Sequence, residues 1–380
     1  MGFALDLDRP RLLLGIGSGT SADAIDLALV EVHGRGGGRR VRILTGDERP
    51  YPEDLAARVR TAVELDPAGL ASLHVDLGRA FAAAAAGFLA DALPAGAALT
   101  AVGSHGQTVF HHGGDPLGGT LQLGDAAWIA DAVGAPVVAD FRWSDLAAGG
   151  QGAPISPFAD WVLHRQAAER LAILNLGGIA NLTLLAGEEP PLAGDTGPAN
   201  GPLDALMRLE AGRPCDRDGR LAAAGVVQAD LVPILRGRPF FGRPFPRSTG
   251  LEAFGEPLVR ELRRTAPQTR LEDLLATLVD LAAWAVGDAL ERLEWPGGPV
   301  FLCGGGARNP TLVKALRRYL EPRYEIRDYA ALGWDPSLRE AVAFALLADA
   351  FLAGEPASWP STTGVRRPAR LGRLVPPPCP

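Results

Sequence analysis

The chain has 380 residues, of which 47% are hydrophobic and 21% are charged, and its formal net charge is -7. This length and composition are typical of a globular protein with about two domains. The negative charge disfavours nucleic acid as the main partner, because a phosphate backbone calls for a basic surface, but it is compatible with a nucleotide held by local amides and a metal ion.

The first part of the chain predicts three strands joined by turns, followed by helices and two further short strands. Short apolar runs bounded by Gly, Ser and Thr indicate the strands. The length and spacing of apolar residues indicate the helices. In chain order, the expected strands are 12–15, 25–32, 41–44, 99–103 and 136–141, and the expected helices are 52–65, 70–93 and 125–133.

The second part of the chain begins in the same way, which indicates an internal repeat. An apolar strand at 171–174, a turn at Gly177-Gly178 and a returning strand at 181–185 repeat the opening of the chain. Further on, we expect a strand at 299–303 and helices at 202–210, 271–293 and 336–352. Another helix is expected to start at Pro310, with Asn309 as its N-cap.

Domain boundaries are expected where Gly and Pro accumulate. The segment 149–157 is rich in both and is the expected linker. We therefore predict an N-terminal domain at 1–148, with 336–380 packing back on it, and a C-terminal domain at 149–335. The tail from Pro356 is expected to be irregular.

The cysteines and the N-terminus predict a cytoplasmic protein. Cys215, Cys303 and Cys379 form no CxxC pair and no Cys/His cluster, so neither a disulfide framework nor a zinc site is expected. The N-terminus has no basic region followed by a long apolar stretch, so no signal peptide is expected. The longest apolar run, Phe81 to Ala90, is too short to span a bilayer, and we expect no membrane partner.

Lysine is almost absent from the sequence, since Lys314 is the only one. A P-loop needs a lysine in its GK[ST] motif, and a protein kinase needs a lysine on a strand. Neither motif is present. Any phosphoryl transfer by this chain must therefore rely on backbone amides, carboxylates and a metal ion.

Three glycine-rich turns follow predicted strands. The first lies after Gly15, the second is Gly177-Gly178, and the third is Gly304-Gly305-Gly306. Such a turn lets backbone amides converge on an anion, and the nearby acidic residues Asp23 and Asp26 could orient Mg²⁺. A tight hairpin with polar decoration is the alternative for the first turn alone. Three turns at strand ends, two of them in repeat-related positions, favour a nucleotide site.

Asp195 opens the segment Asp195-Thr196-Gly197-Pro198. An Asp at the head of a tight turn is usually a turn former or a helix cap. The alternative is a carboxylate displayed on a loop into a cleft. Phosphoryl transfer to a hydroxyl or to water needs such a group to orient and deprotonate the nucleophile.

Several polar segments could line a sugar site. Residues 104–112 contain three His, but their spacing fits no zinc template, so structural or substrate-orienting roles are favoured. The segments 140–142 and 151–154 are polar loops, although Arg142 could equally form a surface ion pair. Glu340, on the final helix, is expected either at the solvent edge or in a pocket.

These motifs, in this order, resemble the anhydro-N-acetylmuramic acid kinase family of the sugar kinase/heat-shock chaperone/actin superfamily. The similar stretches include GSGTSADAID, GSHGQTVFHH, GGQGAP, LGGIAN, DTGPANGPLD, CGGGARNP and STTGVRRPARLG, from residue 15 to about residue 373. The resemblance implies an α/β, two-domain duplicated actin-like (ribonuclease H-like) fold with a nucleotide cleft between the domains.

The resemblance also implies a reaction that uses ATP and Mg²⁺. The 1,6-anhydro ring of anhydro-N-acetylmuramic acid would be hydrolysed and O6 phosphorylated, which gives N-acetylmuramic acid 6-phosphate in cell-wall recycling. Asp195 would activate the water that attacks C1. A homodimer is implied as well.

The resemblance and the glycine turns together give the candidate site residues. The candidate ATP-binding residues are Gly17, Ser18, Gly19, Thr20, Ser21, Ala22, Asp23, Ala24, Ile25, Asp26, Asn175, Gly177, Gly178, Asn181, Gly304, Gly305, Gly306 and Asn309, with Asp23 as the candidate metal ligand. The candidate substrate residues are His105, Gln107, Thr108, Arg142, Gln151 and Glu340.

Three positions depart from the family pattern, namely Gly17, Ala24 and Ala199. If Ala24 required a positive φ, alanine there would cost about 1–2 kcal/mol. Three alternatives stay open. The first is a kinase of the same fold for another amino sugar, and the second is a non-catalytic actin-like nucleotide-binding switch. The third is a degenerate, non-catalytic member of the family, in which Ala24 would weaken ATP binding.

Overall fold

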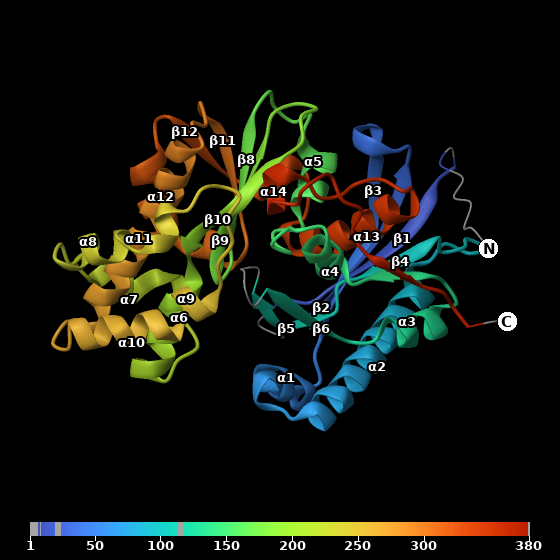
Figure 1. Cartoon of the computed structure of the whole chain (residues 1–380), viewed down its shortest axis with the longest axis horizontal. Helices are drawn as coiled ribbons and strands as arrows, with labels where there is room; N and C mark the ends of the chain where they lie inside the picture. Colours follow the sequence, from blue (N-terminus) through green and yellow to red (C-terminus); the bar gives the residue numbers. More distant parts are fainter. Residues whose placement is uncertain (1–6, 8, 20–23, 113–117, 379–380) are drawn as a thin grey trace. The chain divides into compact units, whose positions relative to one another are not determined.

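The computed structural model describes residues 7, 9–19, 24–112 and 118–378. The chain divides into two compact units (Figure 1). Unit 1 comprises Met1–His164 and Ser337–Pro380, and unit 2 comprises Arg165–Pro336. The domain bounds predicted from the sequence, with a division after residue 148 and a return at 336, stay a prediction.

Unit 1 is built on a six-stranded sheet with the order β13-β7-β4-β1-β2-β3. The strands β1, β2 and β3 form an antiparallel meander, whereas β4 and β7 run parallel to β1. A separate hairpin pairs β5 with β6. The bounds are β1 (Arg11–Gly17), β2 (Ala24–His33), β3 (Arg40–Pro50), β4 (Ala101–Ser104), β5 (Gln107–His112), β6 (Gly119–Leu123), β7 (Val137–Ala139) and β13 (Arg373–Val375).

Helices cover the sheet of unit 1. They are α1 (Glu53–Arg60), α2 (Pro67–Ala92), α3 (Ala126–Val133), α4 (Phe141–Ala147), α5 (Pro157–His164), α13 (Arg339–Leu352) and α14 (Pro360–Thr363). Figure 1 shows the red α13 beside the blue β1, although they come from opposite ends of the chain. Glycine permits this approach, because a Cβ on Gly15 would lie 1.7 Å from the carbonyl oxygen of Ala341.

Helix α2 is the one helix among the described residues that is long and apolar enough to cross a membrane, by length and composition only. Its side chains Leu73, Leu77, Phe81 and Phe88 are buried in the hydrophobic core of unit 1. This burial is typical of a core helix.

Unit 2 is built on a five-stranded sheet with the order β10-β9-β8-β11-β12. Its strands are β8 (Leu171–Leu176), β9 (Ile179–Leu185), β10 (Leu192–Pro198), β11 (Gly298–Cys303) and β12 (Tyr324–Asp328). The first three strands form an antiparallel meander, and β11 and β12 run parallel to β8. This is the same order and direction as β3-β2-β1-β4-β7, so the predicted duplicated α/β fold is confirmed.

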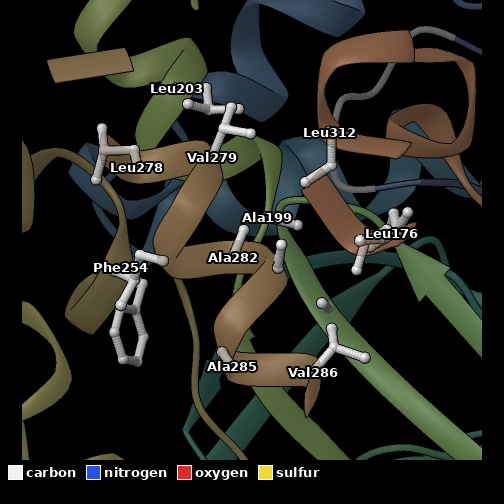
Figure 2. Packing of buried hydrophobic residues seen from close by; sticks show 14 of the residues in the cluster. Leu176, Ala199, Leu203, Phe254, Leu278, Val279, Ala282, Ala285, Val286 and Leu312 are labelled. Atoms are coloured by element: carbon white, nitrogen blue, oxygen red, sulfur yellow. The ribbon is translucent and has the colours of Figure 1, made fainter. Parts of the chain in front are cut away.

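The helices of unit 2 pack on one face of its sheet around α11. They are α6 (Asn200–Ala211), α7 (Arg220–Ala224), α8 (Leu231–Arg236), α9 (Leu251–Phe254), α10 (Glu256–Thr265), α11 (Leu271–Arg292) and α12 (Pro310–Leu320). Figure 2 shows Val279, Ala282 and Val286 of α11 in a cluster with Leu203 and Leu176. Small alanine side chains let α11 lie close to its neighbours.

Most predicted strands and helices are confirmed, but two expectations are wrong. The tail is not irregular, because it contains α14 and β13, and β13 pairs with β7. The strand expected at 136–141 ends at Ala139, since Asp140 takes a positive φ of 57° and α4 starts at Phe141. The hairpin β5-β6, the strands β10 and β12, and the helices α4, α5 and α7 to α10 were not predicted.

Candidate active site

The first glycine turn connects β1 to β2 in unit 1. Gly17 ends β1 and pairs with Asp26 of β2. Four of the candidate residues, Thr20, Ser21, Ala22 and Asp23, lie outside the described residues. The candidates Ala24 and Ile25 are buried at the start of β2. Ala24 has no positive φ, so the cost considered for alanine at this position does not arise.

Gln107 connects this turn to β5. Its side chain is fully buried, and its Oε1 accepts hydrogen bonds from the Ser18 hydroxyl at 2.6 Å and the Tyr51 hydroxyl at 2.9 Å. Its Nε2 donates to the carbonyl oxygen of Gly19 at 3.2 Å. The side chain of Gln107 therefore fixes the described part of the turn.

His105 and Arg142 form a second group in unit 1. The Nε of Arg142 donates to Nε2 of His105 at 3.0 Å, and Nδ1 of His105 lies 3.0 Å from the carbonyl oxygen of Gly106. An arginine can only donate and a carbonyl can only accept, so His105 is neutral and carries its proton on Nδ1. Burial, and then the charge of Arg142, hold the pKa of His105 well below its usual value.

Asp145 ties three segments of unit 1 together. Its carboxylate is fully buried and accepts hydrogen bonds from the Ser358 hydroxyl at 2.5 Å, the Thr363 hydroxyl at 2.7 Å and the Gly152 amide at 2.7 Å. The carbonyl oxygen of the same Gly152 accepts from Nη1 of Arg142 at 2.8 Å. Residue 152 is thus held from both sides, and the tail supports the loop that carries Gln151. Sequence reasoning missed Asp145, because nothing local marks it.

The hairpin β5-β6 adds His111 and Thr108 to this region. Nδ1 of His111 lies 3.0 Å from the Thr120 hydroxyl, and the Thr108 hydroxyl accepts from Nε2 of Gln122 at 3.2 Å. His111 touches the Gly152 loop, since a Cβ on Gly152 would lie 3.0 Å from its ring. Burial, with the charge of Arg142 next, lowers the pKa of His111 to about 4.

Glu340 lies in the first turn of α13, where its side chain is exposed. The neighbouring Arg339 is buried instead and forms an ion pair with Asp160, with Nη2 and Oδ2 2.6 Å apart. Of the two positions expected for Glu340, the solvent edge is therefore the one observed. Its substrate contact stays a prediction.

The second and third glycine turns meet in unit 2. Carbonyl oxygens of Gly177 and Gly178 accept hydrogen bonds from the amides of Asn200 and Gly201, at 3.0 and 2.9 Å, at the start of α6. Gly304 has a φ of +77°, and a Cβ there would lie 2.5 Å from the side chain of Asn175. Both turns follow parallel strands, β8 and β11, so they lie at the same edge of the sheet.

Asn309 follows the third turn as the N-cap of α12. Its Oδ1 accepts from the amides of Thr311 at 3.0 Å and Leu312 at 3.2 Å, as predicted from the sequence. This cap fixes the direction in which the chain leaves the turn. A nucleotide contact of Asn309 stays a prediction.

Asp195 does not open a tight turn. It lies within β10, at a bulge between Asp195 and Gly197, and is 6% exposed. It is paired with Asn181 of β9, which is paired with Asn175 of β8. Cross-strand neighbours share a face of a sheet, so the three polar side chains form a row. The row lies on the face opposite the hydrophobic cluster that contains Leu174.

The segment 247–249 holds Asp195 in this place. Oδ2 of Asp195 accepts from the Thr249 amide at 2.8 Å. The backbone amide of Asp195 donates to the carbonyl oxygen of Arg247 at 2.8 Å, and Nε of Arg247 donates back to the carbonyl oxygen of Asp195 at 3.1 Å. Sequence reasoning missed Arg247.

Comparisons with known proteins give matches over nearly the whole chain. The family model described as anhydro-N-acetylmuramic acid kinase matches residues 11–377. A protein of that name from Gloeobacter violaceus is 41% identical over 97% of this chain and 99% of its own length. Another of that name, from Xanthomonas campestris pv. campestris, is 42% identical over 96% of this chain and 97% of its own length. The chain also matches a ROK family glucokinase structure from Streptomyces griseus, with 15% identity, a TM-score of 0.40 and coverage of 88% of this chain and 98% of that chain.

Proposed function

The chain belongs to the anhydro-N-acetylmuramic acid kinase family, and we propose that it opens the 1,6-anhydro ring of anhydro-N-acetylmuramic acid and phosphorylates O6 at the expense of ATP. The resemblance expected from the sequence motifs is thereby confirmed, and the chain is a kinase. The product would be N-acetylmuramic acid 6-phosphate, which belongs to cell-wall recycling. A cytoplasmic location and a homodimer are parts of the same proposal.

The observation that supports this proposal most strongly is the setting of Asp195. Its carboxylate is nearly buried, accepts a hydrogen bond from the Thr249 amide, and lies in register with Asn181 and Asn175. Asn175 in turn contacts the glycine turn at Gly304. A fixed carboxylate beside two glycine turns suits a base that acts next to a bound nucleotide.

The proposed reaction joins hydrolysis at C1 to phosphorylation of O6. Asp195 takes one proton from a water molecule, and the water oxygen forms a bond to C1 of the sugar. The bond between C1 and O6 breaks, and O6 keeps its electron pair. O6 then accepts the γ-phosphoryl group of ATP, and ADP leaves. Backbone amides of the glycine turns would carry part of the charge that develops on the phosphates.

The side chains of unit 1 would orient the sugar. Arg142 is fixed by His105 and Gly152, and a fixed guanidinium suits the carboxylate of the muramic acid lactyl group. Gln107, which hydrogen-bonds to the first glycine turn, and Thr108 are the first residues of β5, and Gln151 lies on the Gly152 loop. We propose that these residues and Glu340 bind the sugar. The candidate ATP-binding residues of the three glycine turns would bind the nucleotide.

Mg²⁺ is part of the proposal. Among the residues that the structure describes, no group of three or more His, Cys, Asp or Glu side chains could hold a metal ion. Mg²⁺ at a nucleotide site is commonly held by substrate phosphates and waters with only one or two carboxylates. We propose Asp23, outside the described residues, as its ligand. When bound, Mg²⁺ would neutralise charge on the transferring phosphoryl group.

Replacement of the base tests this proposal. Asp195→Asn should lower kcat by about 10²–10⁴-fold, while ATP binding measured by calorimetry is retained. The exposed Asp230 in the same unit supplies a control, since Asp230→Asn removes an equal charge elsewhere and should leave kcat unchanged. Near-normal turnover in Asp195→Asn would refute the assignment.

Mass spectrometry of the product tests the substrate. Incubation with ATP, Mg²⁺ and anhydro-N-acetylmuramic acid should give a product heavier by one phosphoryl group and one water. A product that gains phosphate without water would exclude coupled hydrolysis. No product from this sugar, but turnover of another amino sugar, would favour the other kinase that the sequence left open. ATP binding without turnover of any sugar would favour the nucleotide-binding switch.

A further inference from the structure

We propose that Arg247 is a positioning residue for Asp195, which sets both the place and the charge of that carboxylate. The inference rests on the proposed role of Asp195 as the base. Arg247 lies in the segment between α8 and α9, and its guanidinium donates to the carbonyl oxygens of Asp195 and Thr196 in β10.

Arg247 is 2% exposed, and its guanidinium donates to main-chain oxygens. Its Nε donates to Asp195 at 3.1 Å and its Nη2 to Thr196 at 3.4 Å, so two consecutive carbonyls of β10 are held by one rigid group. Its Nη1 donates to carbonyl oxygens of Phe240 at 3.3 Å, Phe241 at 2.9 Å and Arg243 at 3.2 Å. The planar fork of arginine can make these contacts together, whereas a lysine cannot.

Aromatic rings and glycines complete the fit. The guanidinium carbon of Arg247 lies 4.6 Å from the ring centroid of Phe240 and 4.4 Å from that of Phe245. A Cβ on Gly194 would lie 2.7 Å from the ring of Phe245, and one on Gly197 would lie 2.9 Å from the ring of Phe241. The two glycines that flank Asp195 therefore let this segment approach the strand.

The charge of Arg247 acts on Asp195 as well. Burial lowers the pKa of Arg247 to about 10, while Asp288 and Asp195 raise it and Arg292 and Arg243 lower it. Arg247 is therefore cationic at neutral pH. A buried cation beside a carboxylate favours the ionised carboxylate, which is the form that a base requires.

Thr249 makes the third contact of the same segment with Asp195. Its amide donates to Oδ2 at 2.8 Å, so the side chain of Asp195 is oriented by residue 249 and its main chain by residue 247. Displacement of the segment would move both. A misplaced base lowers kcat without necessarily changing the affinity for ATP.

The pH profile of kcat tests the inference. Arg247→Met should lower kcat by about tenfold to a hundredfold and move the acidic limb of the profile up by about 0.5–1 pH unit, with the Kd for ATP unchanged. Arg247→Lys keeps the charge and loses the fork, so it should lower kcat without moving the limb. A merely structural role would not separate the two variants in this way.

Arg213→Met is the control, because Arg213 is exposed, lies in the same unit and carries the same charge outside this segment. It should leave kcat and the acidic limb as in the wild type. A folded Arg247→Met with wild-type kcat and an unmoved limb would overturn the inference. If Arg247→Met does not fold, wild-type kcat in Arg247→Lys would overturn it equally.

Asp195→Asn separates this inference from the proposed function. If Asp195→Asn is active, the base itself is wrongly assigned. If it is inactive while the Arg247 variants behave as the wild type, only the inference about Arg247 fails. If Asp195 is the base and Arg247 acts through it, addition of Arg247→Met to Asp195→Asn should cause no further loss of kcat.

Discussion

The two units hold their polar candidate residues in different ways. In unit 1 the side chains of distant segments hold one another, as Asp145 does with Ser358 and Thr363. In unit 2 main-chain groups, the guanidinium of Arg247 and positions without a Cβ hold these residues, as at Gly304 and at the β10 bulge. Loss of a hydrogen-bonding side chain should therefore disturb the candidate residues of unit 1, whereas an added methyl group should disturb the glycine turns of unit 2.

The largest effect should come from a methyl group at Gly304. Its φ of +77° is strained for alanine, and a Cβ would lie 2.5 Å from Asn175 Oδ1 and 2.9 Å from the carbonyl oxygen of Leu176. Gly304→Ala should lower the free energy of unfolding by about 3–4 kcal/mol, the sum of backbone strain and steric overlap. Denaturant unfolding would measure this loss.

Gly305→Ala is the matched control for the fold and a test of the ligand. A Cβ there would meet only the side chain of Asn200, at 3.7 Å, and its φ is not positive. Stability should change little, while ATP affinity should fall if the nucleotide lies against this turn. Equal free energies of unfolding for Gly304→Ala and Gly305→Ala would contradict the claim that the glycine turns of unit 2 depend on positions without a Cβ.

A smaller loss is expected at Asp145 in unit 1. Asp145→Asn keeps the shape of the side chain but replaces a charged acceptor of three hydrogen bonds with a neutral amide. We expect the free energy of unfolding to fall by about 2–3 kcal/mol. The KM for the sugar should rise about tenfold, because the Gly152 loop and Arg142 lose their support, while the KM for ATP stays constant.

The exposed Asp131 of unit 1 provides the control for charge alone. Asp131→Asn should change neither the free energy of unfolding nor the KM for the sugar. Thr363→Ser should retain the hydrogen bond to Asp145, and Thr363→Val should lose it at nearly equal volume. A rise in KM for the sugar with Thr363→Ser, but not with Thr363→Val, would contradict the role given to the tail.

The difference between the units also explains what the sequence could predict. Glycine turns and apolar strands are local patterns, so the meander of unit 1, the strands β8 and β9, the glycine turns and the Asn309 cap were predictable from a few neighbouring residues. The partners of Asp145 lie 213 and 218 positions away, and Arg247 lies 52 positions from Asp195. No periodicity connects such residues. The hairpin β5-β6 was missed because its polar residues lack the apolar alternation of a strand.

Acid should affect unit 1 more than unit 2, because all six histidines lie at or before His164. His164 is 1% exposed, and burial lowers its pKa to about 4. The charge of Asp160 opposes this shift, and the charge of Arg339 adds to it. Between pH 4 and 6.5, the unfolded chain therefore binds more proton at His164 than the folded chain does. The stability that neutral His164 contributes is present above pH 6.5 and declines as the pH falls, by about 2 kcal/mol at pH 5. Hydrogen exchange at pH 7 and pH 5 should show that unit 1 loses amide protection before unit 2 as the pH falls. His164→Gln should flatten the pH dependence of stability in unit 1. The control His112→Gln, at an exposed position, should not flatten it. Equal loss of protection in both units would contradict this expectation.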